Sequence, residues 1–245
     1  MLAAIVLTLN EEEHLPDCLA SLEWADQVVV FDSFSQDATV TLAKEAGARV
    51  IQHRFENYAA QRNAALDAVP DADWVLFVDA DERVSSELAQ EIDAWTKTDE
   101  YVAAWIPRHN YIFGRLTLHA GWHPDYQLRL FRGGLARYDP TRPVHELVQV
   151  NGAAAYLNHP LDHLNYSTVG EFMAKQRDYA DFDARRLYEQ GQRGKPWHYL
   201  LQPARHFWWR YVTLGGWRDG FHGLRLCALM AYFQFVMVRR VKTLE

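Results

Sequence analysis

Residues 74–82 read Trp-Val-Leu-Phe-Val-Asp-Ala-Asp-Glu, and this stretch decides the fold. Its first five residues are all apolar, which predicts a strand buried on both faces of a sheet. Asp79 and Asp81 follow at the carboxyl end of that strand. Residues i and i+2 of an extended chain point to the same face, so both carboxylates are expected to reach one small volume. Two such anions repel each other and are costly to desolvate unless a cation lies between them or beside one of them.

Mg²⁺ or Mn²⁺ is the cation that this pattern favours. Both ions prefer oxygen ligands, and Mg²⁺ usually completes its coordination with substrate phosphates. A solvated acidic turn before a helix near Ser85 is the simpler alternative. Asp-x-Asp alone does not separate the two interpretations, so the rest of the chain has to decide between them.

Apolar runs alternate with helix-like segments along the first hundred residues. Strands are predicted at 3–9, 27–31, 48–52 and 74–78, and helices at 11–22, 38–46, 58–68 and 85–95. Repeated strand–helix units with continuous apolar strands predict an α/β fold with a doubly wound, mostly parallel sheet flanked by helices. In such sheets, ligands bind beyond the carboxyl ends of the strands.

Polar residues gather in three groups at that edge of the predicted sheet. The groups are Asn10 and Glu11, then Asp32, Ser33, Ser35 and Asp37, and then Asp79 and Asp81. Each group alone is explained by helix capping, but three groups at one edge favour a binding site. The turn after the first strand is Leu-Asn-Glu-Glu rather than glycine-rich, which argues against a dinucleotide site. A metal held by Asp79 and Asp81 would supply the positive charge instead.

Charge is unevenly distributed along the chain. The 245 residues have a formal net charge of −7, yet residues 197–245 hold 7 Lys and Arg against 2 Asp and Glu. The acidic body argues against nucleic-acid binding. Cys18 and Cys227 lie far apart and predict neither a disulfide framework nor a metal cluster, as expected in a reducing cytoplasm. Met1 leads directly into an apolar strand, so no signal peptide is expected.

The basic C-terminal segment is also aromatic. Helices are predicted at 168–187, 197–214 and 221–241. The longest apolar stretch, 226–238, has about 13 residues, whereas a membrane span needs ~20. Flanking arginines and the pair Trp208-Trp209 suit a headgroup interface, which predicts peripheral binding to the inner face of the cytoplasmic membrane. Packing on the body, or a homo-oligomer formed through these helices, is the alternative.

Four segments, taken in order, resemble the inverting family-two glycosyltransferases with the GT-A fold. They are 7–11 (LTLNE), 30–39 (VFDSFSQDAT), 61–63 (QRN) and 78–82 (VDADE). Later segments resemble one branch of that family, the enzymes related to lipopolysaccharide-core β-glucosyltransferases. These are 126–132 (YQLRLFR), 144–146 (VHE), 163–167 (HLNYS) and 203–242. The resemblance implies a nucleotide-sugar-binding catalytic domain over 1–166 and a helical, membrane-interfacial extension over 167–245.

The same resemblance implies a donor pocket. Its predicted residues are Thr8, Leu9, Asn10, Glu11, Asp32, Ser33, Arg62, Gln127 and Arg129. Asp32 would accept a hydrogen bond from the uracil ring or the ribose, and Arg62 would face the base or the diphosphate. Gln127 and Arg129 share a face of the strand-like run Gln-Leu-Arg-Leu-Phe-Arg, from which they could reach the diphosphate or the sugar.

The metal site implied by the resemblance centres on Asp81. Asp79 would bind ribose or the donor sugar, with Ala80 beside it, and Asp81 would be the direct metal ligand. His163 matches a histidine that completes the metal coordination in some relatives. A hydrogen-bonded histidine before a helix is an equally good interpretation of that position.

Glu146 is the candidate general base. Inverting transfer is a single displacement in which a carboxylate takes the proton of the acceptor hydroxyl. In the family this base is often the acid of a Glu-Asp pair, and His145-Glu146 occupies that place here, which leaves open which of the two acts. A structural ion pair between Glu146 and Arg142 is the alternative. A zinc protease is excluded because Gln149 stands where His-Glu-x-x-His requires its second histidine.

These features together predict an inverting, divalent-metal-dependent glycosyltransferase. Its donor would be a nucleotide sugar, UDP-hexose in particular, and its acceptor a hydroxyl of a saccharide or lipid-linked molecule in cell-envelope glycan synthesis. A catalytically inactive module that binds sugar nucleotides and membranes is the non-enzymatic alternative. A phosphohydrolase with an Asp-x-Asp nucleophile is disfavoured, because Glu82-Arg83 replaces the usual continuation of that motif.

Overall fold

The computed structural model describes residues 1–140 and 148–245, and these residues fall into two compact units. The first unit comprises Met1–Arg108 and Asp125–His163, and the second comprises His109–Pro124 and Leu164–Glu245. The predicted domains were consecutive, with a boundary after residue 166. The units are not consecutive, because residues 109–124 group with the C-terminal helices.

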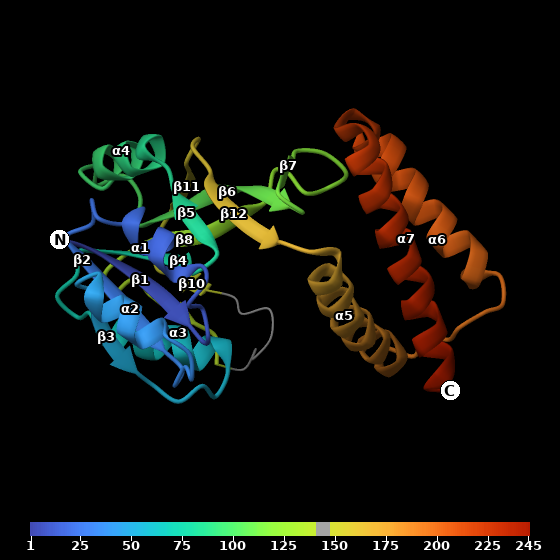
Figure 1. Cartoon of the computed structure of the whole chain (residues 1–245), viewed down its shortest axis with the longest axis horizontal. Coiled ribbons are helices and arrows are strands. Elements are labelled where there is room, and N and C mark those ends of the chain that lie inside the picture. Colours follow the sequence, from blue (N-terminus) through green and yellow to red (C-terminus); the bar gives the residue numbers. More distant parts are fainter. Residues whose placement is uncertain (141–147) are drawn as a thin grey trace. The chain divides into compact units, whose positions relative to one another are not determined.

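The first unit is an α/β sandwich (Figure 1). Its elements, in chain order, are β1 (Leu2–Thr8), α1 (Leu15–Ala20), β2 (Gln27–Asp32), α2 (Thr39–Glu45), β3 (Arg49–Gln52), α3 (Tyr58–Asp67), β4 (Trp74–Asp79), β5 (Glu82–Val84), α4 (Ser86–Trp95), β6 (Ala103–Ile112), β8 (Tyr126–Arg132), β9 (Ala136–Tyr138), β10 (Val148–Val150), β11 (Ala154–Tyr156) and β12 (Leu161–Tyr166). Strands β6 and β12 begin in this unit and end in the second.

The main sheet has the strand order β3-β2-β1-β4-β8-β6-β12-β5. Its first four strands are parallel, whereas β8 runs antiparallel to both β4 and β6. β9 and β10 form a separate antiparallel pair. The carboxyl ends of β1, β2 and β4 therefore meet at one edge, as the sequence predicted.

Alternate residues of β1 pack against different helices. Ala4 and Val6 belong to the core that contains the buried faces of α1, α2 and α4. Ala3 and Ile5 belong to the opposite core, which contains the buried residues of α3. Since successive side chains of a strand point to opposite faces, helices cover both sides of the sheet. The prediction of a doubly wound α/β fold is confirmed.

Helix starts follow local capping chemistry. The Asn57 side chain accepts a hydrogen bond from the Ala60 backbone N–H at 2.9 Å at the start of α3, and Ser85 caps α4 in the same way through Leu88. The predicted helix 11–22 is wrong at both ends, because α1 is limited to six residues. Asn10 has a left-handed backbone (φ 57°), and residues 12–14 form turns before the helix begins at Leu15, with Pro16 in its first turn.

The second unit is mainly helical. Its elements are β7 (Arg115–Thr117), α5 (Val169–Glu189), α6 (His198–Trp208), the π-helical turn η1 (Trp209–Thr213), the 3₁₀ turn η2 (Gly216–Asp219) and α7 (Gly220–Thr243). A capping box between Thr168 and Glu171 begins α5. The unit has its own core, which includes Phe172 of α5 and Leu226 and Phe233 of α7.

Helix α7 bears on the membrane prediction. Among the described residues, one helical stretch, Gly216–Thr243, is long and apolar enough to cross a membrane by length and composition. The uninterrupted apolar run 226–238 is shorter than a membrane span, whereas the helical stretch that contains it has 28 residues. Within this stretch, α7 contributes Leu226 and Phe233 to the core of the second unit, although 33% of its most apolar window is buried. Peripheral binding therefore stays a prediction.

Candidate functional site

Asp79 ends β4 and is held by two guanidinium groups. Arg62 of α3 places Nη2 3.4 Å from Asp79 Oδ1, and Arg129 of β8 places Nη1 3.2 Å from the same oxygen while its Nη2 contacts Oδ2. Burial opposes ionisation of Asp79, but Arg129 and then Arg62 outweigh it and hold the pKa of Asp79 well below its usual value. Asp79 is therefore an anion whose charge is already compensated.

Glu82 contacts both Asp79 and Arg129 and is completely buried. It accepts the backbone N–H of Asp79 at 2.9 Å and lies 3.3 Å from guanidinium nitrogens of both Arg108 and Arg129. Arg108 in turn pairs with Asp125 at 2.6 Å. In the sequence, Glu82 is distinguished only as the residue that follows Asp-x-Asp. The structure makes it the centre of a buried ion-pair network that fixes the end of β4.

Asp81 has a different partner from Asp79. Strand β12 pairs with β5 so that His163 lies opposite Glu82, and this register brings His163 Nε2 to 3.3 Å from Asp81 Oδ2. The bare Asp-x-Asp spacing allowed one metal to be held by both aspartates, whereas the family resemblance assigned Asp81 alone as the direct metal ligand and Asp79 to the ribose or donor sugar. In the structure, Asp79 is neutralised by arginines and Asp81 lies beside a histidine, because the chain turns at Ala80 after β4 ends.

Asp81 and His163 fit a divalent metal only in part. A carboxylate oxygen and an imidazole nitrogen are both ligands of Mn²⁺, and Mg²⁺ accepts the carboxylate. Residues 1–140 and 148–245 contain no group of three or more His, Cys, Asp and Glu side chains that could hold a metal. The pair therefore supplies part of a coordination sphere that substrate phosphates and water would have to complete, as is usual for Mg²⁺.

The loops after β1 and β2 are tied together by buried polar contacts. Asp32 is fully buried and accepts hydrogen bonds from Thr8 Oγ1 at 3.1 Å, from the backbone N–H of Ser35 at 3.0 Å and from Gln52 Nε2 at 3.1 Å. The hydroxyl of Ser35 also donates to it. A carboxylate has about four acceptor positions. Asp32 thus organises the loop, and a nucleotide would have to replace one of these donors to contact it directly.

The other residues of the predicted nucleotide pocket lie around these loops. Asn10 accepts the backbone N–H of Gln36 at 2.8 Å, and the backbone N–H of Glu11 donates to Thr39 Oγ1 at 2.8 Å. The Ser33 hydroxyl accepts from Gln61 Nε2 at 3.0 Å. Leu9 is half exposed beside them. These contacts order the β1 and β2 loops and leave Leu9 and Asn10 accessible to a ligand.

A cavity of about 710 Å³ opens in the first unit beside Asp79. Its described lining residues are Arg62, Asp79, Trp105, Gln127, Leu128, Arg129, Tyr138, Asp139, Val148 and Gln149. Gln127 and Arg129 both line it, as their shared strand face predicted. Trp105, the third residue of β6, and Tyr138, the last residue of β9, were not predicted, and nothing local in the sequence marked either of them.

The candidate base and its neighbour, Glu146 and His145, lie outside the described residues. The nearest described residues in sequence that line the cavity are Asp139 and Val148. The role of Glu146 stays a prediction from the sequence.

A parallel sheet with polar loops at the carboxyl ends of β1, β2 and β4, and an Asp-x-Asp turn after β4, defines a GT-A fold. The chain belongs to glycosyl transferase family 2, whose model matches residues 3–164. It is therefore a sugar-transferring enzyme of the glycosyltransferase class.

Relatives match almost the whole chain. The lipopolysaccharide core biosynthesis glycosyltransferase LpsC of Rhizobium meliloti (strain 1021) is 28% identical over 98% of this chain and 91% of its own length. An uncharacterized glycosyltransferase of Rickettsia bellii (strain RML369-C) is 27% identical over 98% of this chain and 86% of its own length. The crystal structure of S. aureus TarS 1-349 superposes with a TM-score of 0.50 at 17% identity, covering 98% of this chain and 91% of that one. This structural match supports the fold alone.

Proposed function

We propose that this protein transfers a hexose from a UDP-linked donor, with inversion, to a hydroxyl of a saccharide or lipid-linked acceptor in lipopolysaccharide or related cell-envelope glycan synthesis. The name of its relative LpsC supports the lipopolysaccharide assignment. The reaction would take place at the cytoplasmic face of the membrane. The basic, aromatic helices of the second unit support that location.

The observation that carries the proposal is the cavity beside Asp79. Arg62 and Arg129 both line it, and paired guanidinium groups match the oxygens of a diphosphate in geometry. Gln127 adds an amide on the same side for hydroxyl recognition. The volume of about 710 Å³ lies in the usual range for small-molecule sites.

Charge balance supports a divalent metal. Arg129 is already paired with Asp79 and Glu82, and Arg62 with Asp79, so these arginines bring little net positive charge to a diphosphate. Mg²⁺ or Mn²⁺ held by Asp81 and His163 would neutralise the departing nucleoside diphosphate. The arginines would orient it, and Glu146 would take the proton of the acceptor hydroxyl.

Replacing Asp81 by alanine tests the proposal. We expect loss of Mn²⁺-dependent UDP binding with little change in thermal stability, because the change removes a ligand and leaves the Asp79–Glu82 network intact. Calorimetric titration of UDP with and without Mn²⁺ measures this. Asp93→Ala, which removes an exposed carboxylate of α4, is the matched control. Undiminished Mn²⁺-dependent affinity in Asp81→Ala would refute the metal assignment.

Turnover separates the enzyme from an inactive binding module. We expect release of UDP from UDP-hexose to accelerate when an acceptor is added. Tight donor binding with no release, with or without an acceptor extract of cell-envelope lipids, would favour the module.

A further inference from the structure

The side chains of helix α6 are all at least partly exposed to solvent. None of its residues His198–Trp208 is buried. Leu200 is 79% exposed, Leu201 63% and Trp208 64%. Exposed apolar side chains of this size in one helix mark a surface that contacts something apolar. The charges beside them indicate which kind of molecule that is.

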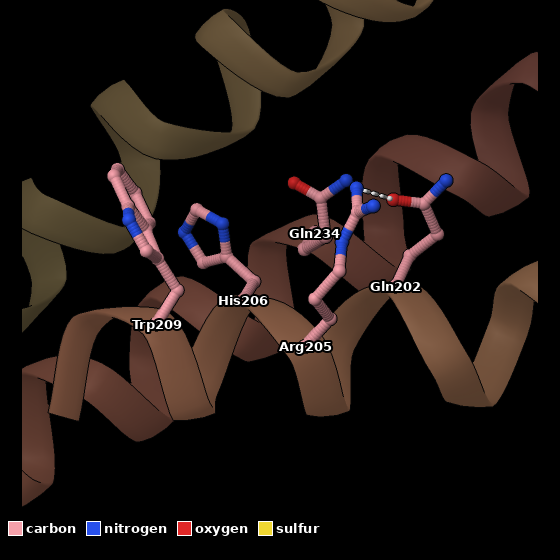
Figure 2. A pocket seen from close by; sticks show the side chains of 5 residues that line it. All are labelled: Gln202, Arg205, His206, Trp209 and Gln234. Carbon is pink, nitrogen blue, oxygen red and sulfur yellow. Dashed lines mark hydrogen bonds between the residues drawn. The ribbon is translucent and has the colours of Figure 1, made fainter. Parts of the chain in front are cut away.

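A pocket of about 420 Å³ lies between α6 and α7, within the second unit (Figure 2). Its lining residues are Gln202, Arg205, His206, Trp209 and Gln234. Gln202 lies three and four residues before Arg205 and His206 of α6, and Trp209, the first residue of η1, follows these two by four and three residues, so the four side chains share one helical face. Gln234 comes from α7. Figure 2 shows the Arg205 guanidinium bonded to the Gln202 side chain, at 3.1 Å, with Gln234 beside it. These lining residues include arginine, amide, imidazole and indole groups, and no carboxylate.

The positive charge at this pocket is not neutralised. Arg210 Nε donates to His206 Nε2 at 2.9 Å, and Arg210 Nη1 donates to the backbone oxygen of Ala120 at 2.6 Å. Neither Arg205 nor Arg210 pairs with a carboxylate of the described residues. Because Nε2 of His206 accepts a hydrogen bond, its proton lies on Nδ1, which can donate. Burial, and then Arg210 and Arg205, lower the pKa of His206 to about 4.

A second, apolar groove adjoins the polar pocket. It has a volume of about 390 Å³ and is lined by Trp197, His198, Leu201, Gln202 and Arg205. Gln202 and Arg205 line both hollows, so they form the boundary between them. A cationic, donor-rich pocket that continues into a groove with an exposed tryptophan and leucine is complementary to a molecule with an anionic head and an apolar chain.

We infer that the α6–α7 pocket binds the phosphate of an anionic lipid headgroup, with the adjoining part of the lipid chain along Trp197 and Leu201. Arg205 is the principal phosphate ligand, and Nδ1–H of His206 and the amides of Gln202 and Gln234 are further donors. Arg210, anchored on Ala120, keeps the pocket positive. The inference deepens the proposed membrane association by naming its headgroup site, and it rests on that part of the proposed function.

The test uses the full-length protein without any sugar donor, so it is independent of transferase activity. Partition is measured by co-sedimentation with phosphatidylcholine vesicles made anionic with phosphatidic acid or, at the same surface charge, with oleate. We expect Arg205→Gln to lower the partition coefficient for the phosphatidic acid vesicles more than tenfold. Loss of one charge-assisted hydrogen bond weakens binding by that factor. Arg218→Gln, which removes an exposed arginine of η2, is the matched control, with a loss of at most about fivefold from surface charge alone.

Arg205→Lys separates a phosphate site from general electrostatics. Lysine keeps the charge but loses the planar, two-point contact, so partition to phosphatidic acid should fall while partition to oleate vesicles stays within about twofold. Equal losses for Arg205→Gln and Arg218→Gln, or equal binding of wild type to the two kinds of vesicle, would overturn the inference. Melting curves of each variant confirm that the second unit remains folded.

Calorimetry distinguishes a lipid from free phosphate. Dihexanoyl phosphatidic acid, used below its micelle concentration, should bind more tightly than inorganic phosphate because it also fills the groove. Leu201→Ser should weaken the short-chain lipid without changing inorganic phosphate. If both ligands bind equally, and Leu201→Ser affects neither, the pocket is an anion site without a lipid role and the headgroup assignment is wrong.

Discussion

The arginines at the candidate sites of the two units differ in whether they pair with carboxylates. In the first, Arg129 is buried and pairs with Asp79 and with Glu82, itself fully buried. In the second, Arg205 and Arg210 have no carboxylate partner among the described residues, and Arg205 is exposed. A buried charge without a partner is strongly destabilising, whereas an exposed one costs little. Arg129 of the first unit therefore helps to build the site, while exposed Arg205 of the second remains available to a ligand.

Aromatic residues near the two candidate sites also differ in their burial. The rings of Phe77 and Tyr138 lie under Arg62 at 5.0 and 5.6 Å, and both rings are buried. Trp197 and Trp208 of the second unit are more than half exposed. An aromatic ring that supports a cation in a core fixes geometry, and one left in solvent offers contact area to a partner.

Glu146→Gln tests whether Glu146 acts as a general base, in contrast to Asp79 and Glu82, which form ion pairs. The substitution preserves shape but removes basicity, so we expect turnover to fall ~10²–10⁴-fold with donor binding nearly unchanged. That range corresponds to ~2.7–5.4 kcal/mol of transition-state stabilisation. Steady-state kinetics and UDP titration measure the two quantities.

His145→Gln is the neighbouring control for that experiment. A supporting histidine should cost less turnover than the base itself. If Glu146→Gln keeps turnover within about twofold of wild type, the base is His145 or another acid of the cavity.

Glu82→Ala breaks the charge balance of the first unit directly. It leaves Arg108 and Arg129 facing a cavity where the carboxylate was, and removes the acceptor of the Asp79 N–H. We expect a loss of ~3–5 kcal/mol in the free energy of unfolding, typical of a broken buried ion pair. Urea denaturation measures it.

Asp67→Ala is the matched control because it breaks the exposed Asp67–Arg137 pair of the same unit. Its expected cost is ~0–1 kcal/mol. Comparable losses in the two variants would mean that Glu82 contributes no more than a surface charge.

The sequence predicts the fold well wherever the signal is local. Continuous apolar runs identified β1, β2 and β4, and Asn57 and Ser85 mark the starts of α3 and α4. In β8, Gln127 and Arg129 both line the cavity beside Asp79. Each of these features depends on residues within about one turn or one strand of each other.

The rest depends on contacts between distant residues. Glu82 is 26 residues from Arg108 and 47 from Arg129, and nothing near Glu82 distinguishes it from a turn residue. His119 bonds Asp219 at 2.7 Å across 100 residues, which helps explain why residues 109–124 group with the C-terminal helices. Asp-x-Asp spacing predicted that Asp79 needs a cation, but it could not tell an arginine from a metal.

Asp32→Ala tests whether a buried carboxylate that is saturated with donors also recognises the nucleotide. We expect UDP affinity to fall by ~1.5–3 kcal/mol, either through a lost hydrogen bond to uridine or through loosening of the loop that it organises. Ser35→Ala, which removes one donor to Asp32, separates the two causes, since it disturbs the loop and keeps the carboxylate. If wild type binds GDP as tightly as UDP by calorimetry, the uridine assignment fails.

His206→Gln gives the smallest effect and tests the uncompensated charge of the second unit. Burial, then Arg210 and Arg205, lower the pKa of His206 to about 4 from an ordinary value of 6.5. The unfolded chain therefore binds a proton between these values that the folded protein does not. Wild type should lose stability as the pH falls from about 6.5 to about 4, by an amount of order 1 kcal/mol after discounting for partial exposure.

Glutamine keeps an acceptor for Arg210 but does not titrate, so the difference in unfolding free energy between pH 7 and pH 5 should be smaller in His206→Gln than in wild type. Urea denaturation of both proteins at the two pH values measures it. His198→Gln, on the same helix, controls for the loss of a histidine in general. If His206→Gln and wild type show the same pH dependence, the arginines beside His206 are neutralised in solution, and the contrast between the two units disappears at this position.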